Sequence, residues 1–144
     1  MRLVVSSFVV ILAAVAGFAP APLPRTERLR DVPPNLNGKW EFVVWKNHGR
    51  ESAITQRLEI QDKKCEFITL DNAARADYEF ILYPGMSPRG FEWKRGQYEH
   101  YVGSYRVQGD RLILVFESNK DMANRSTDFS GKAPYHFELR RQSR

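Results

Sequence analysis

The feature that most constrains the fold is an alternation of apolar and polar side chains with a period of two, which recurs along most of the chain. In residues 39–46, Trp40, Phe42 and Val44 fall on one face, and the residues between them fall on the other. This period indicates a β-strand with one buried face. Seven further segments alternate similarly or are rich in β-forming residues, and turn-forming residues separate them. The predicted strands are residues 39–46, 56–61, 65–70, 76–83, 90–94, 98–107, 111–117 and 134–141.

An up-and-down barrel is the simplest architecture for this series of strands. Most of the connections are short, and no segment carries a convincing run of apolar residues at helical spacing. Closure of eight antiparallel strands pairs the two edges that an open sheet would expose. We therefore predict an all-β, eight-stranded, antiparallel, up-and-down barrel, whose interior holds packed side chains or one small ligand. A two-layer sandwich fits the same alternation and is the alternative.

The residues before the first strand have the pattern of an export signal and a linker. Arg2 precedes an apolar run over residues 3–15, and Ala14-Val15-Ala16 has the form of a signal-peptidase site. Cleavage after Ala19 is one alternative, and an uncleaved anchor is another. The run is short for a membrane span, and we expect none in the mature chain. We predict a signal peptide over residues 1–16, a proline-rich linker over 17–34 and the folded domain over 35–142, in a protein exported to the periplasm, cell envelope or medium.

Composition excludes several classes of protein. The single cysteine, Cys65, permits no intramolecular disulfide and no cysteine-rich zinc cluster, so we expect it to be a small buried hydrophobe. The net charge of +5 comes from scattered basic residues, without a basic helix or a basic run interleaved with aromatic residues. We therefore expect no nucleic-acid partner; the charge favours solubility or loose contact with anionic envelope polymers.

No motif in the chain points to catalysis. The three histidines, His48, His100 and His136, have no metal-binding spacing, and no G-x-S-x-G sequence or glycine-rich phosphate loop occurs. The sequence therefore predicts no catalytic residue, no metal ligand and no cofactor, and we expect a protein that is not an enzyme.

Several short motifs resemble those of known families. Gly38-Lys39-Trp40 resembles the Gly-x-Trp opening of lipocalin-like (calycin) barrels. Together with Gly103-Ser104-Tyr105, Gly109-Asp110-Arg111-Leu112 and residues 125–132, it resembles an exported domain family abundant in planctomycetes. The resemblance covers residues 36–141. It implies an eight-stranded barrel and carries no activity over to this chain.

The chain departs from this family at two positions, and the sequence also indicates structural roles for several residues. Ser126 stands where family members often have proline, and Val115 where a cysteine is common. Lipocalins pair the first-strand tryptophan with an arginine of the last strand, and both Arg140 and Arg141 are candidates here. We expect Trp40 to close one end of the barrel, and Arg125 and Asp128 to pair within their loop rather than cover the barrel mouth. The residues assigned structural roles are Gly38, Trp40, Gly109, Asp110, Arg125 and Asp128.

Aromatic residues supply the remaining indication of function. The chain has three Trp, six Tyr and nine Phe, and several of them align on the predicted inner face. They are sufficient to fill a small barrel as core, or to line an apolar pocket. We expect an exported monomer that binds a small apolar ligand; the alternative is a filled-core structural module, or one that contacts an envelope protein or polymer. The candidate lining residues are Trp40, Phe42, Tyr78, Phe80, Trp93, Tyr105, Phe116 and Phe137.

Overall fold

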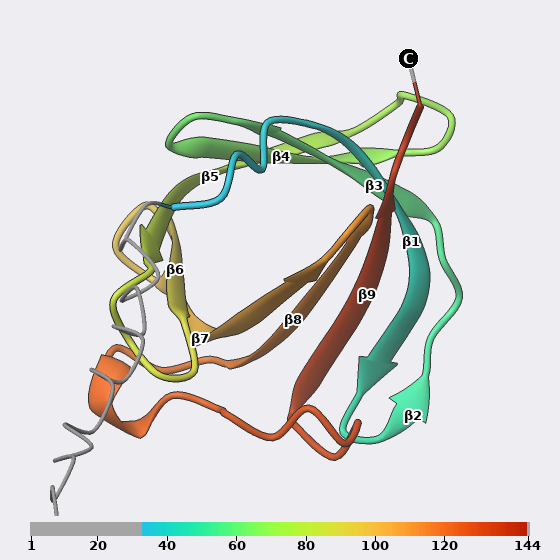
Figure 1. The fold of residues 1–144 in the computed structure, drawn as a ribbon. Coiled ribbons are helices and arrows are strands. Elements are labelled where there is room, and N and C mark those ends of the chain that lie inside the picture. Colours follow the sequence, from blue (N-terminus) through green and yellow to red (C-terminus); the bar gives the residue numbers. More distant parts are fainter. Residues whose placement is uncertain (1–32, 144) are drawn as a thin grey trace, which may run out of the picture.

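Each of the eight segments forms a strand in the computed structural model, which describes residues 33–143 (Figure 1). A ninth, two-residue strand lies in a region that the sequence predicts as a turn. The predicted signal peptide and all but the last two residues of the predicted linker lie outside the described residues. The strands are β1 (Gly38–Asn47), β2 (Arg50–Glu51), β3 (Gln56–Gln61), β4 (Lys64–Thr69), β5 (Arg75–Tyr83), β6 (Gly90–Arg95), β7 (Glu99–Gln108), β8 (Arg111–Glu117) and β9 (Tyr135–Arg141).

The strands close into an antiparallel barrel. From β3 to β9 each strand pairs with its neighbours in sequence, and β1 pairs with β3 on one side and β9 on the other. The β1–β9 ladder runs from Trp40 opposite Arg141 to Asn47 opposite Tyr135, which leaves no open edge between the first and last strands. The short β2 pairs only with the end of β1. The barrel prediction is confirmed, and the sandwich alternative is excluded.

A bulge in β1 changes which residues face inward. Phe42 lies opposite Leu139 and Val44 opposite Glu138, so Val43 is an extra residue without a partner in β9. Such an insertion reverses the alternation beyond it. The predicted inward position of Val44 is therefore wrong. Trp45 packs inside instead, with its ring centroid 4.7 Å from that of Phe137.

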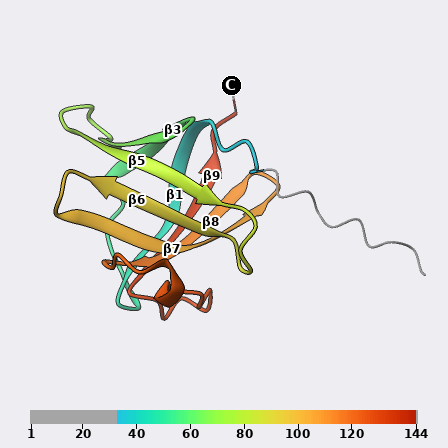
Figure 2. The ribbon, with the colours of Figure 1, turned by 90° about the vertical axis from the view of Figure 1, so that its left-hand side faces the viewer.

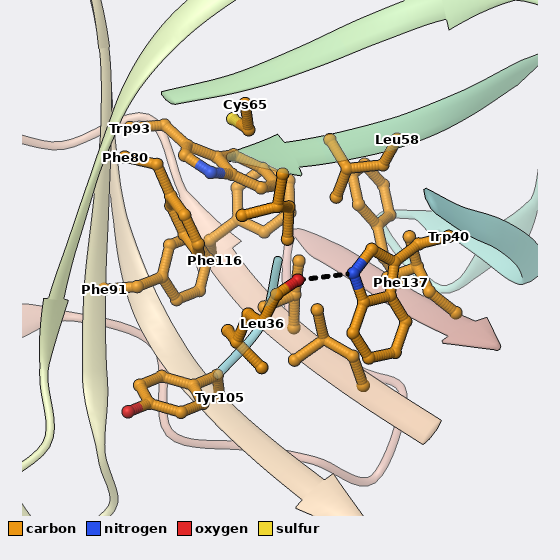
Figure 3. Close-up of a cluster of buried hydrophobic side chains, with 14 of the residues drawn as sticks. Leu36, Trp40, Leu58, Cys65, Phe80, Phe91, Trp93, Tyr105, Phe116 and Phe137 are labelled. Carbon is orange, nitrogen blue, oxygen red and sulfur yellow. Dashed lines mark hydrogen bonds between the residues drawn. The ribbon is translucent and has the colours of Figure 1, made fainter. Parts of the chain in front are cut away.

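A continuous apolar core fills much of the barrel (Figure 3). Its members come from the inner faces of the strands and from Leu36, just before β1. Cys65 is buried in this core, as the sequence predicts, and burial raises the pKa of its thiol. Gly103 lies opposite Phe116, where a Cβ atom would stand 2.2 Å from the Val115 carbonyl oxygen. Only glycine allows the two strands to pack in this way.

The longest connection, residues 118–134, covers part of the outer wall of the barrel (Figure 2). It contains the 3-10 turn η1 (Met122–Asn124). The guanidinium of Arg106, on β7, lies 3.9 Å from the centroid of the Phe129 ring. Arg125 donates through Nη2 to the carbonyl of Pro88 at 2.7 Å. Two outward-facing side chains in this part of the barrel, Val102 on β7 and Val115 on β8, are fully buried.

The predicted pairing of Arg125 with Asp128 is wrong. Arg125 also donates to the carbonyl of Met122, whereas Asp128 accepts the backbone N–H of Ser130 at 2.8 Å. Arg125 therefore attaches the long connection to the β5–β6 loop, and Asp128 stabilises a local turn. Among residues 33–143 the structure contains no helix with the length and hydrophobicity needed to cross a membrane.

Candidate functional site

The alternating strand directions place the connections at two ends of the barrel. The chain enters β1 at one end, where the turns at residues 62–63, 84–89 and 109–110 also lie. We call this the closed end. The connections at residues 48–55, 70–74 and 96–98 lie at the other end, which we call the open end. The connection at residues 118–134 begins and finishes at the open end but runs along the outer wall as far as the β5–β6 loop.

The closed end is sealed by Trp40. Its side chain is fully buried, and its indole Nε1 donates to the carbonyl of Leu36 at 2.8 Å (Figure 3). The guanidinium of Arg141 lies 4.6 Å from the Trp40 ring centroid and donates to the carbonyls of Asn37 and Asn35 at 3.1 and 2.7 Å. Arg141 therefore covers the ring and ties the segment entering β1 to the last strand.

The structure distinguishes the two arginines that the sequence leaves as alternatives. Arg141 pairs with Trp40, whereas Arg140 lies with its Nε 3.9 Å from the Asp110 carboxylate. The Arg140 and Asp110 side chains are both largely exposed. Their ion pair is therefore screened by water and contributes little to stability.

The open end contains a pocket of about 200 Å³. All eight barrel strands contribute to its wall, and none of the lining side chains from the described residues carries a carboxylate, ammonium or guanidinium group. Eight of its residues are aromatic, and the other two are Gln56 and Ala76. The lining residues are Trp45, Gln56, Phe67, Ala76, Tyr78, Trp93, Tyr101, Phe116, Tyr135 and Phe137.

The pocket has a packed floor and a partly exposed rim. Trp93, Phe116 and Phe137 are at most 3% exposed and form the floor. Phe116 packs edge-to-face against both Trp93 and Phe137, each with a centroid separation of 4.8 Å. These contacts fix the ring orientations before any ligand arrives, because edge-to-face pairs are favourable in themselves. The remaining aromatic residues of the wall are partly exposed and form the rim.

The hydroxyl of the rim residue Tyr78 forms a hydrogen bond with a neighbouring side chain. The Tyr78 hydroxyl donates to Glu99 at 2.6 Å. Burial, reinforced by this hydrogen bond, raises the pKa of Tyr78 to about 12. Burial also raises the pKa of Tyr101. Both phenols are therefore protonated at neutral pH, and the wall offers polar but uncharged groups.

The pocket includes only part of the predicted lining set. Tyr78, Trp93, Phe116 and Phe137 lie in its wall. The other four predicted residues belong to the core and not to the wall, because their strands place them closer to the closed end. They are Trp40, Phe42, Phe80 and Tyr105.

Sequence reasoning missed six residues of the wall. Trp45 was missed because the bulge in β1 is not visible in the alternation. Phe67, Tyr101 and Tyr135 do follow the alternation, and their closeness to connections at the open end was a usable signal. The other two lie at the starts of strands at the open end: Gln56 begins β3, and Ala76 is the second residue of β5.

A second group of titratable side chains lies on the outer wall. Glu92, 6% exposed, accepts from the Tyr83 hydroxyl at 2.7 Å and from Lys94 at 2.9 Å, and it pairs with His100 Nε2. Burial alone would raise the pKa of Glu92, but the hydrogen bonds from Lys94, Tyr83 and His100 hold it below its usual value. These groups form hydrogen bonds and ion pairs with one another and lie outside the pocket wall. Their network links β5, β6 and β7.

Within residues 33–143, no three His, Cys, Asp or Glu side chains are grouped in a way that could hold a metal ion. Comparisons of the chain with protein-family models, curated proteins and solved structures find no match. Function must therefore be inferred from the pocket itself, since a barrel supports many activities.

Proposed function

We propose that the protein is an exported, non-enzymatic binding protein that holds a small apolar ligand in the open-end pocket. The observation that carries the proposal is a space of about 200 Å³ surrounded by eight aromatic side chains, with every barrel strand contributing. The pocket opens to solvent, and its lining distinguishes it from the larger hollows on the surface of the barrel. Those hollows are bordered by charged side chains, whereas eight of the ten residues here are aromatic.

The packing of the floor also favours binding. Trp93, Phe116 and Phe137 are held by mutual ring contacts and by the core beneath them. A ligand therefore does not have to order these side chains as it binds, which lowers the cost of association. The ligand gains the hydrophobic contribution of removing its own apolar surface and that of the rings from water.

The chemistry of the wall favours binding over catalysis. Its polar side chains are an amide, three phenols and two indoles. The phenols of Tyr78 and Tyr101 have raised pKa values, so neither serves as a base at neutral pH. Export is proposed on the leader pattern of residues 1–16.

Native mass spectrometry of the protein purified from its own cells tests the proposal. We expect a reproducible additional mass that is released on gentle unfolding. The variant Ala76→Trp places an indole in the pocket and should lose this mass. Gln61→Trp is the matched control, since it adds the same side chain at an exposed position of the closed end and should keep the mass. A clean apo mass, together with no binding of small apolar probes, would favour the filled-core interaction module instead.

A further inference from the structure

We infer that the pocket selects an uncharged ligand with one or two aromatic rings and a single polar substituent, rather than a long-chain lipid. This inference rests on the proposed function and narrows it to a chemical class. It follows from four properties of the pocket: its volume, its closed floor, the orientation of its rings and its lack of charge.

The volume limits the ligand to a small ring system. An apolar cavity of about 150 Å³ accommodates benzene, and pockets for drug-sized ligands usually measure about 300–1,000 Å³. A pocket of about 200 Å³ lies between these cases. It therefore holds one ring with a substituent, or two small fused rings at the limit.

The floor excludes a long chain. Below Trp93 and Phe116 lie Phe80 and Phe91, which are at most 1% exposed and make ring contacts with Trp93 at 6.0 and 5.0 Å (Figure 3). Leu36 and Trp40 fill the space beyond, at the closed end (Figure 3). An alkyl chain that entered the pocket would therefore have to leave most of its length in water.

The orientation of the wall rings favours an aromatic ligand. The Phe67 ring is nearly perpendicular to that of Trp93, at 85°, and to that of Tyr78, at 76°. The Tyr101 and Tyr135 rings are perpendicular to each other at 90°. A planar ring placed among them meets both faces and edges, and aromatic pairs favour these arrangements over contact with a saturated ring.

The charge of the wall favours a neutral ligand with one polar group. Among residues 33–143 no ionised side chain lines the pocket. Glu99 and Arg95 contact Tyr78 from outside the lining and pair with each other at 3.7 Å, so a carboxylate or ammonium buried with the ligand would have to compete with that ion pair. Gln56 stands at the start of β3, in the wall at the open end, where its amide offers both a donor and an acceptor. A hydroxyl or amide on the ligand can therefore bond there while its ring enters the pocket.

Calorimetric titration with four probes tests the inference on the protein purified as the full chain. The reference probe is benzyl alcohol. Cyclohexylmethanol tests the need for an aromatic ring, benzoate tests charge, and 1-decanol tests chain length. We expect benzyl alcohol to bind about two- to tenfold more tightly than cyclohexylmethanol, and at least about tenfold more tightly than benzoate. The affinity for 1-decanol should not exceed that for benzyl alcohol.

Two variants and one control variant link the binding to the pocket. Ala76→Trp should abolish binding of benzyl alcohol, and Gln61→Trp should not. Gln56→Leu keeps the pocket apolar and should weaken the binding of benzyl alcohol at least about threefold. It should leave the binding of toluene unchanged, because toluene has no hydroxyl group.

The outcomes separate the two proposals. If 1-decanol or cyclohexylmethanol binds more tightly than benzyl alcohol and Ala76→Trp blocks it, the aromatic inference is overturned and the proposed function is kept. Preferred binding of benzoate also overturns the inference. If no probe binds, or if Ala76→Trp and Gln56→Leu both leave binding unchanged, the proposed function fails with it.

Discussion

The two ends of this barrel are built from the same eight strands and from similar aromatic residues, yet the interior is packed at one and holds an aromatic pocket at the other. The hollow at the closed end, about 500 Å³, lies against Leu36 and Phe80 and is bordered by the charged side chains of Asp62, Lys63 and Glu79. At the closed end, Leu36 enters the core and its carbonyl accepts the Trp40 indole N–H at 2.8 Å. At the open end, eight aromatic side chains surround about 200 Å³. Hydrophobic composition alone therefore does not determine whether a barrel end is filled.

The difference lies in where the connecting segments run. At the closed end, the segment before β1 contributes a side chain to the core and is held there by Arg141. At the open end, the longest connection, residues 118–134, is instead attached to the outer wall through Arg125 and Phe129. It supplies none of the lining residues of the pocket, so within residues 33–143 the rings of the strands line a space that no connecting segment fills.

The largest expected effect comes from removing the ring that seals the closed end. Trp40→Ala should lower the free energy of unfolding by about 3–5 kcal/mol, because it leaves a cavity and removes the partner of the Leu36 carbonyl. Trp45→Ala, at the open end, should cost about 1–2 kcal/mol, because its ring is partly exposed and borders space that is already open. Urea denaturation measures both. Equal losses would contradict the distinction between the ends.

Substitutions that add side-chain volume also compare the packed part of the barrel with the open-end pocket. Gly103→Ala should destabilise the protein by about 1–3 kcal/mol, since its new methyl group would lie 2.2 Å from the Val115 carbonyl oxygen. Ala76→Phe adds a much larger group, yet it should change stability by less than about 1 kcal/mol because the ring enters the pocket. Thermal denaturation of both variants checks this ranking, and a larger loss in Ala76→Phe would show that the pocket is not open.

The arginines of β9 provide a matched pair at the closed end. Arg141→Met should cost about 1–2 kcal/mol, because it removes the cation over Trp40 and two hydrogen bonds to carbonyl groups. Arg140→Met removes only an exposed ion pair and should stay within about 0.5 kcal/mol of the wild type. Chemical denaturation of the two variants side by side is the measurement. A reversed order would contradict the role assigned to Arg141.

The smallest expected effect is a change in how much stability the protein loses at alkaline pH, and it concerns Tyr78 at the open end. The pKa of Tyr78 is raised to about 12 in the folded protein, against about 10 in the unfolded chain. The stability it contributes is therefore fully present below pH 10 and is lost as the pH rises toward 12. Tyr78→Phe should show a smaller loss of stability over this range, as followed by denaturation at several pH values. If Tyr78→Phe lost as much stability as the wild type over this pH range, the alkaline loss would not come from Tyr78.

Most of the fold could be predicted from the sequence, because period-two alternation is a local property of each strand. The bulge at Val43 could not, since a register shift depends on how β9 pairs with β1. For the same reason the partner of Arg125 was missed: Pro88 lies 37 residues away and is brought close only by the barrel.

The site was less predictable than the fold. Alternation shows which residues face inward, but not how deep each lies along the barrel axis. Phe80 and Tyr78 share one face of β5, yet Phe80 belongs to the core and Tyr78 to the pocket. Their depth depends on the stagger of neighbouring strands and on Leu36, which fills one end only. A sequence pattern shows neither the stagger of the strands nor the position of Leu36 in the barrel.

The most direct test of the account is a crystal structure of the protein under xenon pressure, because xenon enters empty apolar cavities. We predict xenon in the open-end pocket, next to Trp93, Phe116 and Phe137, and none between Leu36 and Trp40. A pocket closed by inward-turned rim rings and free of xenon, or xenon bound equally at the closed end, would contradict the central claim that the two ends differ.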